Sequence, residues 1–374
     1  MLWKTSLTVS EGRVTEIGTA APKNAARLEL SGFWLSPGLV DMHAHVTFEP
    51  RAHYDEIPFD YGDDSLSSVT RGIRNLTEAS RLGICLVRDM GGREAVTREV
   101  RNIANSGEFN LPETVTSGEP LCLPNGHGSS FGRVFCADSE PEIRDYFRSH
   151  RDAGHEWLKI MNGPELWDAS HLRFLIGIAR SEGLRTAVHA FTPKGIRDGV
   201  HAGANTIEHA LVFEESLIDA VQANGTVFVP THYCSWLSLR PRFTWTQSEV
   251  EVGHLEYWRA LLLDSRIIHQ TSAALTLPGT DAGCSPCTFD DYLHELEQFK
   301  LWGMSEIQVL TAASADAAQT LGRSDDFGSV TVGKWANIII TEKSPLDSLS
   351  HLRDPELILL KGVDVVNHLG ERWK

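Results

Sequence analysis

The stretch that decides the fold is Ser36-Pro37-Gly38-Leu39-Val40-Asp41-Met42-His43-Ala44-His45. It predicts an apolar strand that leaves a Pro-Gly turn and ends in two histidines one residue apart. Because residues i and i+2 of a strand point to the same side, both imidazoles converge on one point. Two neutral ring nitrogens presented in this way can bind a metal ion. A His-x-His pair alone is a weak signal, so the interpretation depends on partners elsewhere in the chain.

Beyond this stretch, short apolar segments that end in polar residues alternate with longer helical segments. The predicted strands are 39–45, 85–89, 115–120, 157–162, 186–191, 206–210, 226–231 and 276–281. Helices are predicted at 65–82, 93–106, 141–153, 170–182, 195–202, 214–223 and 248–271. Eight strands alternating with helices predict an α/β fold of the (β/α)8 TIM-like barrel type. An open doubly wound sheet is the alternative, but no phosphate-binding glycine-rich turn follows the first strand.

Both ends of the chain are rich in predicted strands. These are 7–9, 13–17 and 27–30 near the N-terminus, and 336–341, 356–361 and 364–368 after a helix at 306–321. The N-terminal piece is too small to fold alone. We therefore expect residues 1–36 plus 325–374 to form a small β-sandwich, and residues 37–324 to form the catalytic barrel.

Composition excludes several classes of partner. The net charge of −16 argues against nucleic acid and anionic membranes. No apolar run approaches the ~20 residues of a membrane span, and the N-terminus lacks a signal-peptide pattern. Six scattered cysteines suit reduced thiols better than a disulfide framework. We expect a cytoplasmic enzyme with a small-molecule substrate.

Potential metal ligands recur at the ends of the predicted barrel strands, where barrel active sites are built. They are His43, His45, Lys159, His189, His209 and Asp281. Four histidines and a carboxylate suit Zn²⁺ or a similar divalent ion. Lysine is no ligand while protonated, and an ammonium inside an apolar strand is costly. If its amine adds CO₂, it becomes a carbamate, whose two oxygens can bridge two cations; an ion pair with a carboxylate is the alternative for Lys159.

These motifs, together with 202–209, 279–283, 312–318, 328–337 and 344–346, resemble the amidohydrolase superfamily. The most similar branch is the imidazolonepropionase-like and prolidase-like group of metal-dependent hydrolases. The resemblance covers nearly the whole chain in order, although the N-terminal piece is shorter than usual, so that one sandwich strand could be missing.

The resemblance implies a site with two divalent ions, most readily Zn²⁺. One would be held by His43, His45, Asp281 and carbamylated Lys159, the other by Lys159, His189 and His209. Cations lower the pKa of bound water and make a nucleophile available at neutral pH. Asp281 is the expected general base and acid, which passes the proton to the leaving nitrogen. The family also implies a homo-oligomer.

Candidate substrate contacts lie in the long loops 50–64, 121–134 and 231–246, which we expect to wall the pocket. His127 resembles a family histidine that holds the substrate carbonyl or oxyanion, which makes it a second catalytic candidate. Arg133 can bind a carboxylate as a bidentate fork, and Tyr233 or His232 can contact substrate. Cys284 and Cys287 have CxxC spacing without a second pair and are interpreted as ordinary loop thiols.

The leading hypothesis is hydrolysis of a C–N bond in an amide, dipeptide-like, N-acyl amino acid or cyclic amide compound. One alternative is a mononuclear deaminase or imidazolone-type ring hydrolase. Those relatives carry His-x-x-Glu, whereas His189 is followed by Ala190, Phe191 and Thr192. Esterase or lactonase activity on the same site is a second alternative. A non-enzymatic barrel is a third, and it predicts broken ligands, which this sequence does not have.

Overall fold

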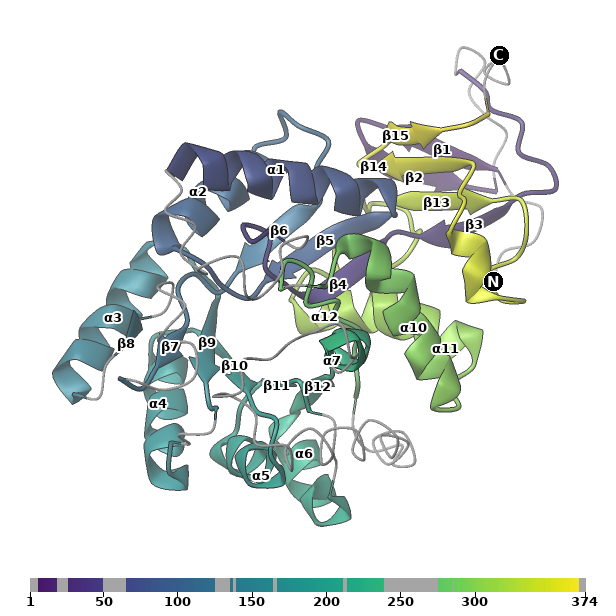
Figure 1. Ribbon diagram of the computed structural model, residues 1–374. Helices are drawn as coiled ribbons and strands as arrows, with labels where there is room; N and C mark the ends of the chain where they lie inside the picture. The colour runs from purple at the N-terminus through teal and green to yellow at the C-terminus, as the bar shows by residue number, and fades with distance from the viewer. Residues whose placement is uncertain are drawn as a thin grey trace.

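The computed structural model is a barrel of parallel strands with a smaller β-structure beside it (Figure 1). It describes residues 6–18, 26–49, 65–124, 135–136, 139–163, 167–210, 214–238, 275–284 and 286–369. The predicted fold class is confirmed. The predicted helix at 248–271 lies outside the described residues, and the domain boundaries stay a prediction.

Two parallel sheets form the barrel wall. One contains β4 (Leu39–Ala44), β5 (Ile84–Asp89) and β6 (Glu113–Thr116). The other contains β9 (Trp157–Met161), β10 (Arg185–His189), β11 (Thr206–Glu208) and β12 (Val227–Val229), with β7 (Leu121–Cys122) and β8 (Phe135–Cys136) at its edge. Apart from β8, these strands are largely buried because they pack against the barrel interior on one face and helices on the other.

The predicted third strand, 115–120, ends at Thr116 in β6, and β7 in the predicted loop 121–134 belongs to the other sheet. β6 pairs with β5, whereas Leu121 in β7 pairs with Ile160 in β9. Gly118 lies between them with φ +58, a conformation that side chains rarely adopt. The chain therefore turns at this glycine and passes from one sheet to the other.

The predicted eighth strand, 276–281, closes the barrel without forming a regular strand. It makes isolated parallel bridges from Thr276 to Phe228 and from Ala282 to Ala44. Pro278 has no N–H to donate, but its carbonyl accepts from Met42 N at 3.1 Å. The expectation of a full strand was wrong, but the segment lies where an eighth strand belongs, between β12 and β4.

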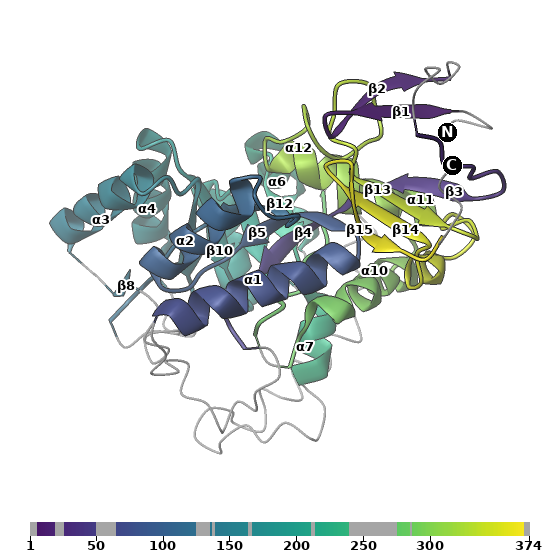
Figure 2. The ribbon, with the colours of Figure 1, turned by 90° about the horizontal axis from the view of Figure 1, so that it is seen from above.

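Helices cover the outside of the barrel. They are α1 (Ser65–Arg81), α2 (Glu94–Asn105), α3 (Glu140–Asp152), α4 (Ala169–Ser181), α5 (Pro193–Ala202), α6 (Ile218–Asn224), α7 (His232–Ser238), α10 (Tyr292–Leu301), α11 (Glu306–Thr311) and α12 (Ala317–Thr320). A π-helical turn, Ala312–Asp316, joins α11 to α12. Part of the predicted loop 231–246 is thus the helix α7. Seen from above, α1 runs along the barrel toward the smaller structure (Figure 2).

The smaller structure is the predicted sandwich from both chain ends. β3 (Trp34–Pro37), β13 (Ile338–Thr341), β14 (Leu357–Leu360) and β15 (Val363–Asn367) form an antiparallel sheet. β1 (Leu7–Ser10) and β2 (Arg13–Ile17) form a hairpin whose Val14 packs into a shared apolar core with Ile338 and Ile340. The strand predicted at 27–30 does not form, and β3 takes its place.

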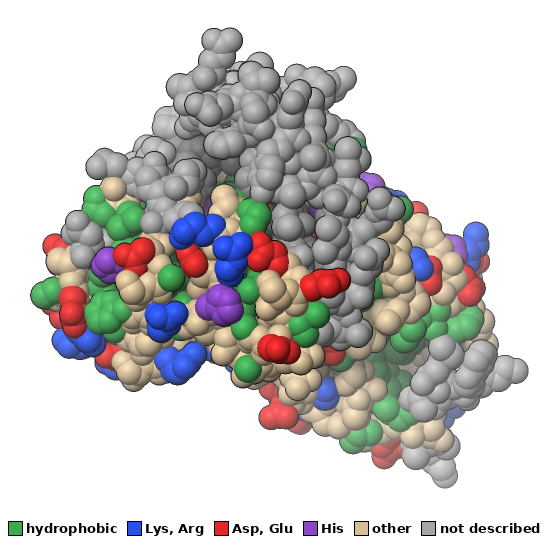
Figure 3. All heavy atoms as spheres, turned by 90° about the horizontal axis from the view of Figure 1, so that it is seen from below, with side chains coloured by type: hydrophobic (Ala, Val, Ile, Leu, Met, Phe, Trp, Pro, Cys, Tyr) green, Lys and Arg blue, Asp and Glu red, His purple; other side chains and the backbone are tan. Residues whose placement is uncertain are grey.

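The described surface carries mixed charge. Seen from below, acidic and basic side chains are interspersed over it (Figure 3). Across the described ranges, no helix has the length and hydropathy that a membrane crossing requires.

Gly83 marks the contact between barrel and sandwich. It ends the turn between α1 and β5 with φ +78, and a Cβ there would lie 2.3 Å from Ile339 Cδ1 on β13. Gly183 occupies the equivalent turn between α4 and β10 with φ +77 and nothing within 4 Å of such a Cβ.

We predict that Gly83→Ala destabilises the protein more than Gly183→Ala. Both substitutions incur the left-handed strain of about 1–2 kcal/mol. Only Gly83→Ala adds overpacking against a buried isoleucine, typically a further ~1–3 kcal/mol. Urea unfolding of both variants measures the difference, and equal losses of stability would contradict tight packing at this junction.

Candidate metal centre

His43 and His45 converge at the end of β4 as predicted. Their Nε2 atoms each lie 3.4 Å from Asp281 Oδ1, on the segment that closes the barrel. Ligand atoms of these three residues all lie within 4.8 Å of one another. His43 is fully buried, and His45 stacks on Phe48, with ring centroids 4.8 Å apart.

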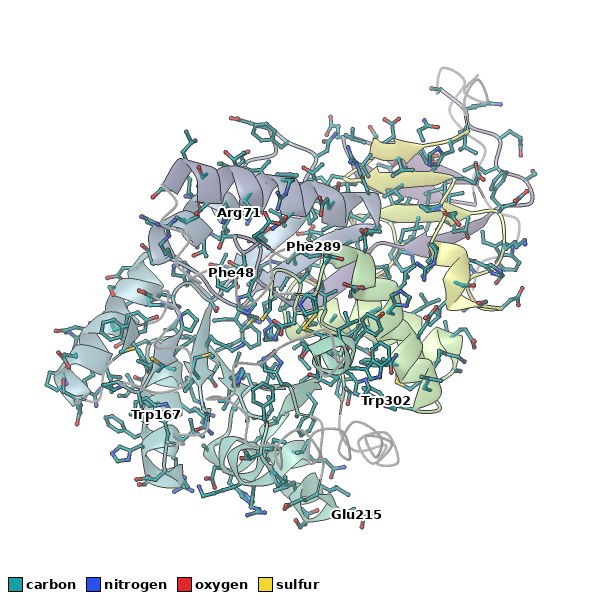
Figure 4. All side chains as sticks on the ribbon, viewed as in Figure 1. Phe48, Arg71, Trp167, Glu215, Phe289 and Trp302 are labelled. Carbon is teal, nitrogen blue, oxygen red and sulfur yellow. A yellow bond between two sulfur atoms is a disulfide. The ribbon has the colours of Figure 1, made fainter. Side chains whose placement is uncertain are left out.

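The loop after β4 is fixed from α1. Arg71 donates to the Thr47 carbonyl at 2.9 Å, and Asn75 donates to the carbonyls of Val46 and Phe48. Phe48 and Arg71 are labelled in Figure 4. These bonds hold the phenyl ring against His45 and shield one side of the imidazole from water.

Asp281 reaches the histidines through an unusual backbone conformation. Its φ is +57°, and His209 and Thr231 at the ends of neighbouring strands also have positive φ, at 59° and 46°. Such conformations in non-glycine residues cost free energy and concentrate at functional sites. Burial raises the pKa of Asp281 to about 7. Its Oδ1 is buried and accepts no hydrogen bond from the described residues. This carboxylate oxygen therefore faces the two Nε2 atoms with its lone pairs unused by those residues.

Lys159 lies inside the barrel on β9, almost wholly buried. Its Nζ is 3.3 Å from His43 Nε2. Within the described part of the chain it makes no ion pair, so the carboxylate partner considered as an alternative is not found there. Burial lowers the pKa of Lys159 to about 8. An appreciable share of the amine is then neutral near physiological pH, and only the neutral amine can add CO₂.

His189 and His209 continue the cluster from β10 and β11. Their ring centroids are 4.5 Å apart, and the His209 ring is 4.8 Å from that of His43. His209 Nδ1 lies 2.7 Å from Thr231 Oγ1. Phe191 covers both rings at 4.4 and 5.1 Å. The structure therefore brings all six predicted ligands to one end of the barrel.

Several supporting residues were missed in the sequence. Asp41 accepts hydrogen bonds from His43 N and from both N and Oγ1 of Thr280, which joins β4 to the closing segment. Glu208 lies 2.6 Å from His43 Nδ1 and pairs with Arg88. The available signal was a charged residue inside an otherwise apolar strand, because such a charge needs a partner.

The donor set fits a divalent metal. Ring nitrogens of His43 and His45 face a buried carboxylate oxygen that accepts no hydrogen bond from the described residues, which leaves lone pairs pointed at one location. The ring nitrogen of His45 on the opposite side, Nδ1, donates to the Gly91 carbonyl at 2.8 Å. A carbonyl can only accept, so the Nε2 of His45 carries the free lone pair.

The structure describes two of the four residues that we expect to contact substrate. His127 and Arg133 lie outside the described residues. His232 and Tyr233 begin α7, where their backbone N–H groups donate to the buried Glu295 at 3.0 and 2.7 Å. The His232 ring lies against Trp302 and the Tyr233 ring against His294. Their role in substrate binding stays a prediction.

The cysteine interpretation requires a correction. Cys234 on α7 and Cys287 form a disulfide, so these two are not reduced thiols and Cys287 is not an ordinary loop thiol. The two residues are 53 positions apart, and sequence spacing could not reveal that the barrel brings them together. Cys85, Cys122, Cys136 and Cys284 are not in disulfides.

Comparison with known proteins agrees with this geometry. Residues 34–365 match the amidohydrolase family. Ochratoxinase of Aspergillus niger is 24% identical over 399 residues, covering 94% of this chain and 80% of the fungal protein. Imidazolonepropionase of Saccharopolyspora erythraea is 25% identical over 258 residues, covering 63% of this chain and 64% of the relative.

Solved structures show the same fold. A Xaa-Pro dipeptidase with bound methionine superposes with a TM-score of 0.85 at 19% identity, covering 96% of this chain and 94% of that one. The match to the family runs from β3 through the whole barrel to β15, and the resemblance read from the motifs is confirmed: the chain belongs to the amidohydrolase family.

Proposed function

We propose that this chain is a metal-dependent hydrolase of C–N bonds that uses two divalent ions. The observation that carries the proposal is the convergence of two imidazole Nε2 atoms on a buried carboxylate oxygen, with Lys159 Nζ 3.3 Å from one of those rings. Family membership supports a hydrolase acting on C–N bonds. The number of ions and their division among the ligands are what the family resemblance implies, and the choice of zinc and the carbamate are consistent with the donor chemistry.

Each residue is assigned by the ligand it offers. His43, His45, Asp281 and carbamylated Lys159 would hold one ion, and Lys159, His189 and His209 the other. Zn²⁺ suits this set of imidazoles and carboxylates. When bound, such ions supply a water of lowered pKa and a Lewis acid for the scissile carbonyl.

The chain itself supplies proton transfer and exclusion of water. Asp281 is the group proposed to take a proton at a carboxylate oxygen and to deliver it to the leaving nitrogen. Phe48 and Phe191 cover the imidazoles on their outer sides. The resulting low dielectric strengthens electrostatic interactions inside the site.

For the substrate we propose an amide of the dipeptide or N-acyl amino acid class. Support comes from the neighbours, which include an ochratoxinase and a Xaa-Pro dipeptidase. Arg133 would bind a substrate carboxylate, and His127 would stabilise the oxyanion. Tyr233 and His232 would contact the substrate from the start of α7.

The deaminase or ring-hydrolase alternative requires a glutamate three residues after His189, and this chain has Thr192 there. That residue stands where a catalytic glutamate would follow His189, and its Oγ1 accepts from Gly195 N at 3.0 Å. Thr192 is therefore the N-cap of α5. Its hydroxyl is engaged in capping and has no acidity near neutral pH.

We predict that removal of metal by a chelator abolishes hydrolysis of the best substrate, and that zinc with bicarbonate restores it. Candidate dipeptides, N-acyl amino acids, lactams and esters are assayed together.

Asp281→Asn should lower kcat by at least about 10³-fold, because the base and a ligand are lost together. Asp316→Asn is the matched control, since Asp316 lines a cavity with Trp157 and Val227 at the opposite strand ends. Turnover of esters alone would overturn the C–N assignment.

We also predict a carbamate at Lys159. Incubation with ¹³C-bicarbonate should give a carbamate NMR signal that is absent in Lys159→Met. Lys159→Ala should lose most activity, with partial rescue by acetate or propionate, because a short carboxylate supplies the missing oxygens. Lys194→Ala, which removes a surface ion pair with Asp198, serves as control. Full activity of Lys159→Ala without added acid would contradict the assignment.

A further inference from the structure

A buried ion pair lies directly behind the metal centre. Arg88 on β5 and Glu208 on β11 are both wholly buried, and Arg88 Nη2 lies 2.9 Å from each carboxylate oxygen. Glu208 Oε2 is 2.6 Å from His43 Nδ1. The pair therefore contacts a proposed ligand on the side of the ring that faces away from the proposed metal.

The contacts of Glu208 decide which nitrogen of His43 carries the proton. Both carboxylate oxygens of Glu208 accept from Arg88 Nη2, and a carboxylate oxygen can only accept hydrogen bonds. Thr206 also donates its hydroxyl to this carboxylate. His43 Nδ1 must then carry the hydrogen, and its Nε2 lone pair points toward Asp281 and Lys159, at 3.4 and 3.3 Å.

Arg88 in turn is fixed by several strands. Its Nε donates to the Met42 carbonyl on β4 at 2.6 Å, and Nη1 donates to Thr206 Oγ1 at 3.0 Å. The guanidinium also lies over the Trp157 ring, 4.5 Å from its centroid. These contacts fix the Arg88 guanidinium, and the guanidinium in turn holds the Glu208 carboxylate beside the His43 imidazole.

Stability alone does not explain such a pair. Removing two charges from water costs free energy that their attraction only partly repays, and apolar replacements are often as stable. A carboxylate behind a ligating histidine, in contrast, fixes the tautomer, the ring orientation and the basicity of that ligand.

We propose that Glu208, held in place by Arg88, is a positioning residue that prepares His43 for metal binding. The inference rests on the proposed function, because it needs a metal at His43. Its consequence is that zinc affinity depends on a residue that never touches the metal.

The test measures zinc affinity directly, by competition with a chromogenic chelator, on the purified full chain. Glu208→Gln should weaken binding of the ion at His43 by about 10–100-fold. Glu295→Gln is the matched control: Glu295 is equally buried, but its carboxylate accepts from the backbone of α7. Its zinc affinity should equal that of the unaltered protein. In ¹⁵N-histidine NMR of the metal-free protein, His43 should be the Nδ1–H tautomer, and Glu208→Gln should reduce that population.

A double variant separates positioning from folding. Glu208→Gln leaves Arg88 as an uncompensated buried charge, so it can unfold the chain. Glu208→Leu with Arg88→Met removes both charges and should recover stability but not zinc affinity. Unaltered affinity in Glu208→Gln, or recovery of zinc affinity in the double variant, would overturn the inference and leave the proposed function standing. Failure of the unaltered chain to bind zinc would overturn the proposed function first.

Discussion

The structure depends on the burial of charged and titratable groups at one end of an apolar barrel. Five strand ends or neighbouring segments bring four imidazoles, an amine and a carboxylate together. Desolvation disfavours every charged form, as the pKa values of Asp281 and Lys159 show. Among the described residues, Asp281 Oδ1 has no hydrogen-bond donor, and this grouping of side chains is the basis on which we propose a bound cation. The positive φ values of His209, Thr231 and Asp281 lie around the same cluster, as is common at functional sites.

The supporting residues follow from the same constraint. Asp41 and Glu208 accept hydrogen bonds in the barrel interior, and Arg88 neutralises the latter. Asp41 and Glu208 each bind a polar group of His43, and as buried polar residues they each need a hydrogen-bond partner of their own. The result is a polar network that extends from the strand ends into the middle of the barrel, where most barrels hold only branched apolar side chains.

The local sequence pattern predicted much of the fold and of the candidate site. Strand periodicity and turn residues predicted β4, β5, β9, β10 and most outer helices, and the ligands could be recognised because barrel strands end where active sites lie. What could not be predicted depends on non-local geometry. The passage of the chain from one sheet to the other at Gly118, the irregular closing segment at Pro278 and the Cys234–Cys287 disulfide each require knowledge of which distant segments meet. The partnership of Arg88 with Glu208, 120 residues apart, is of the same kind.

The continuity of β3 and β4 has a mechanical consequence. β3 pairs with β13 in the sandwich, and after Pro37 and Gly38 the chain becomes the strand that carries His43 and His45. Gly38 N donates to the Asn337 carbonyl at 2.9 Å, immediately at this transition. The sandwich therefore holds the start of the first barrel strand in place through backbone hydrogen bonds. In such an arrangement the terminal strands anchor the base of a strand whose far end carries the two histidines.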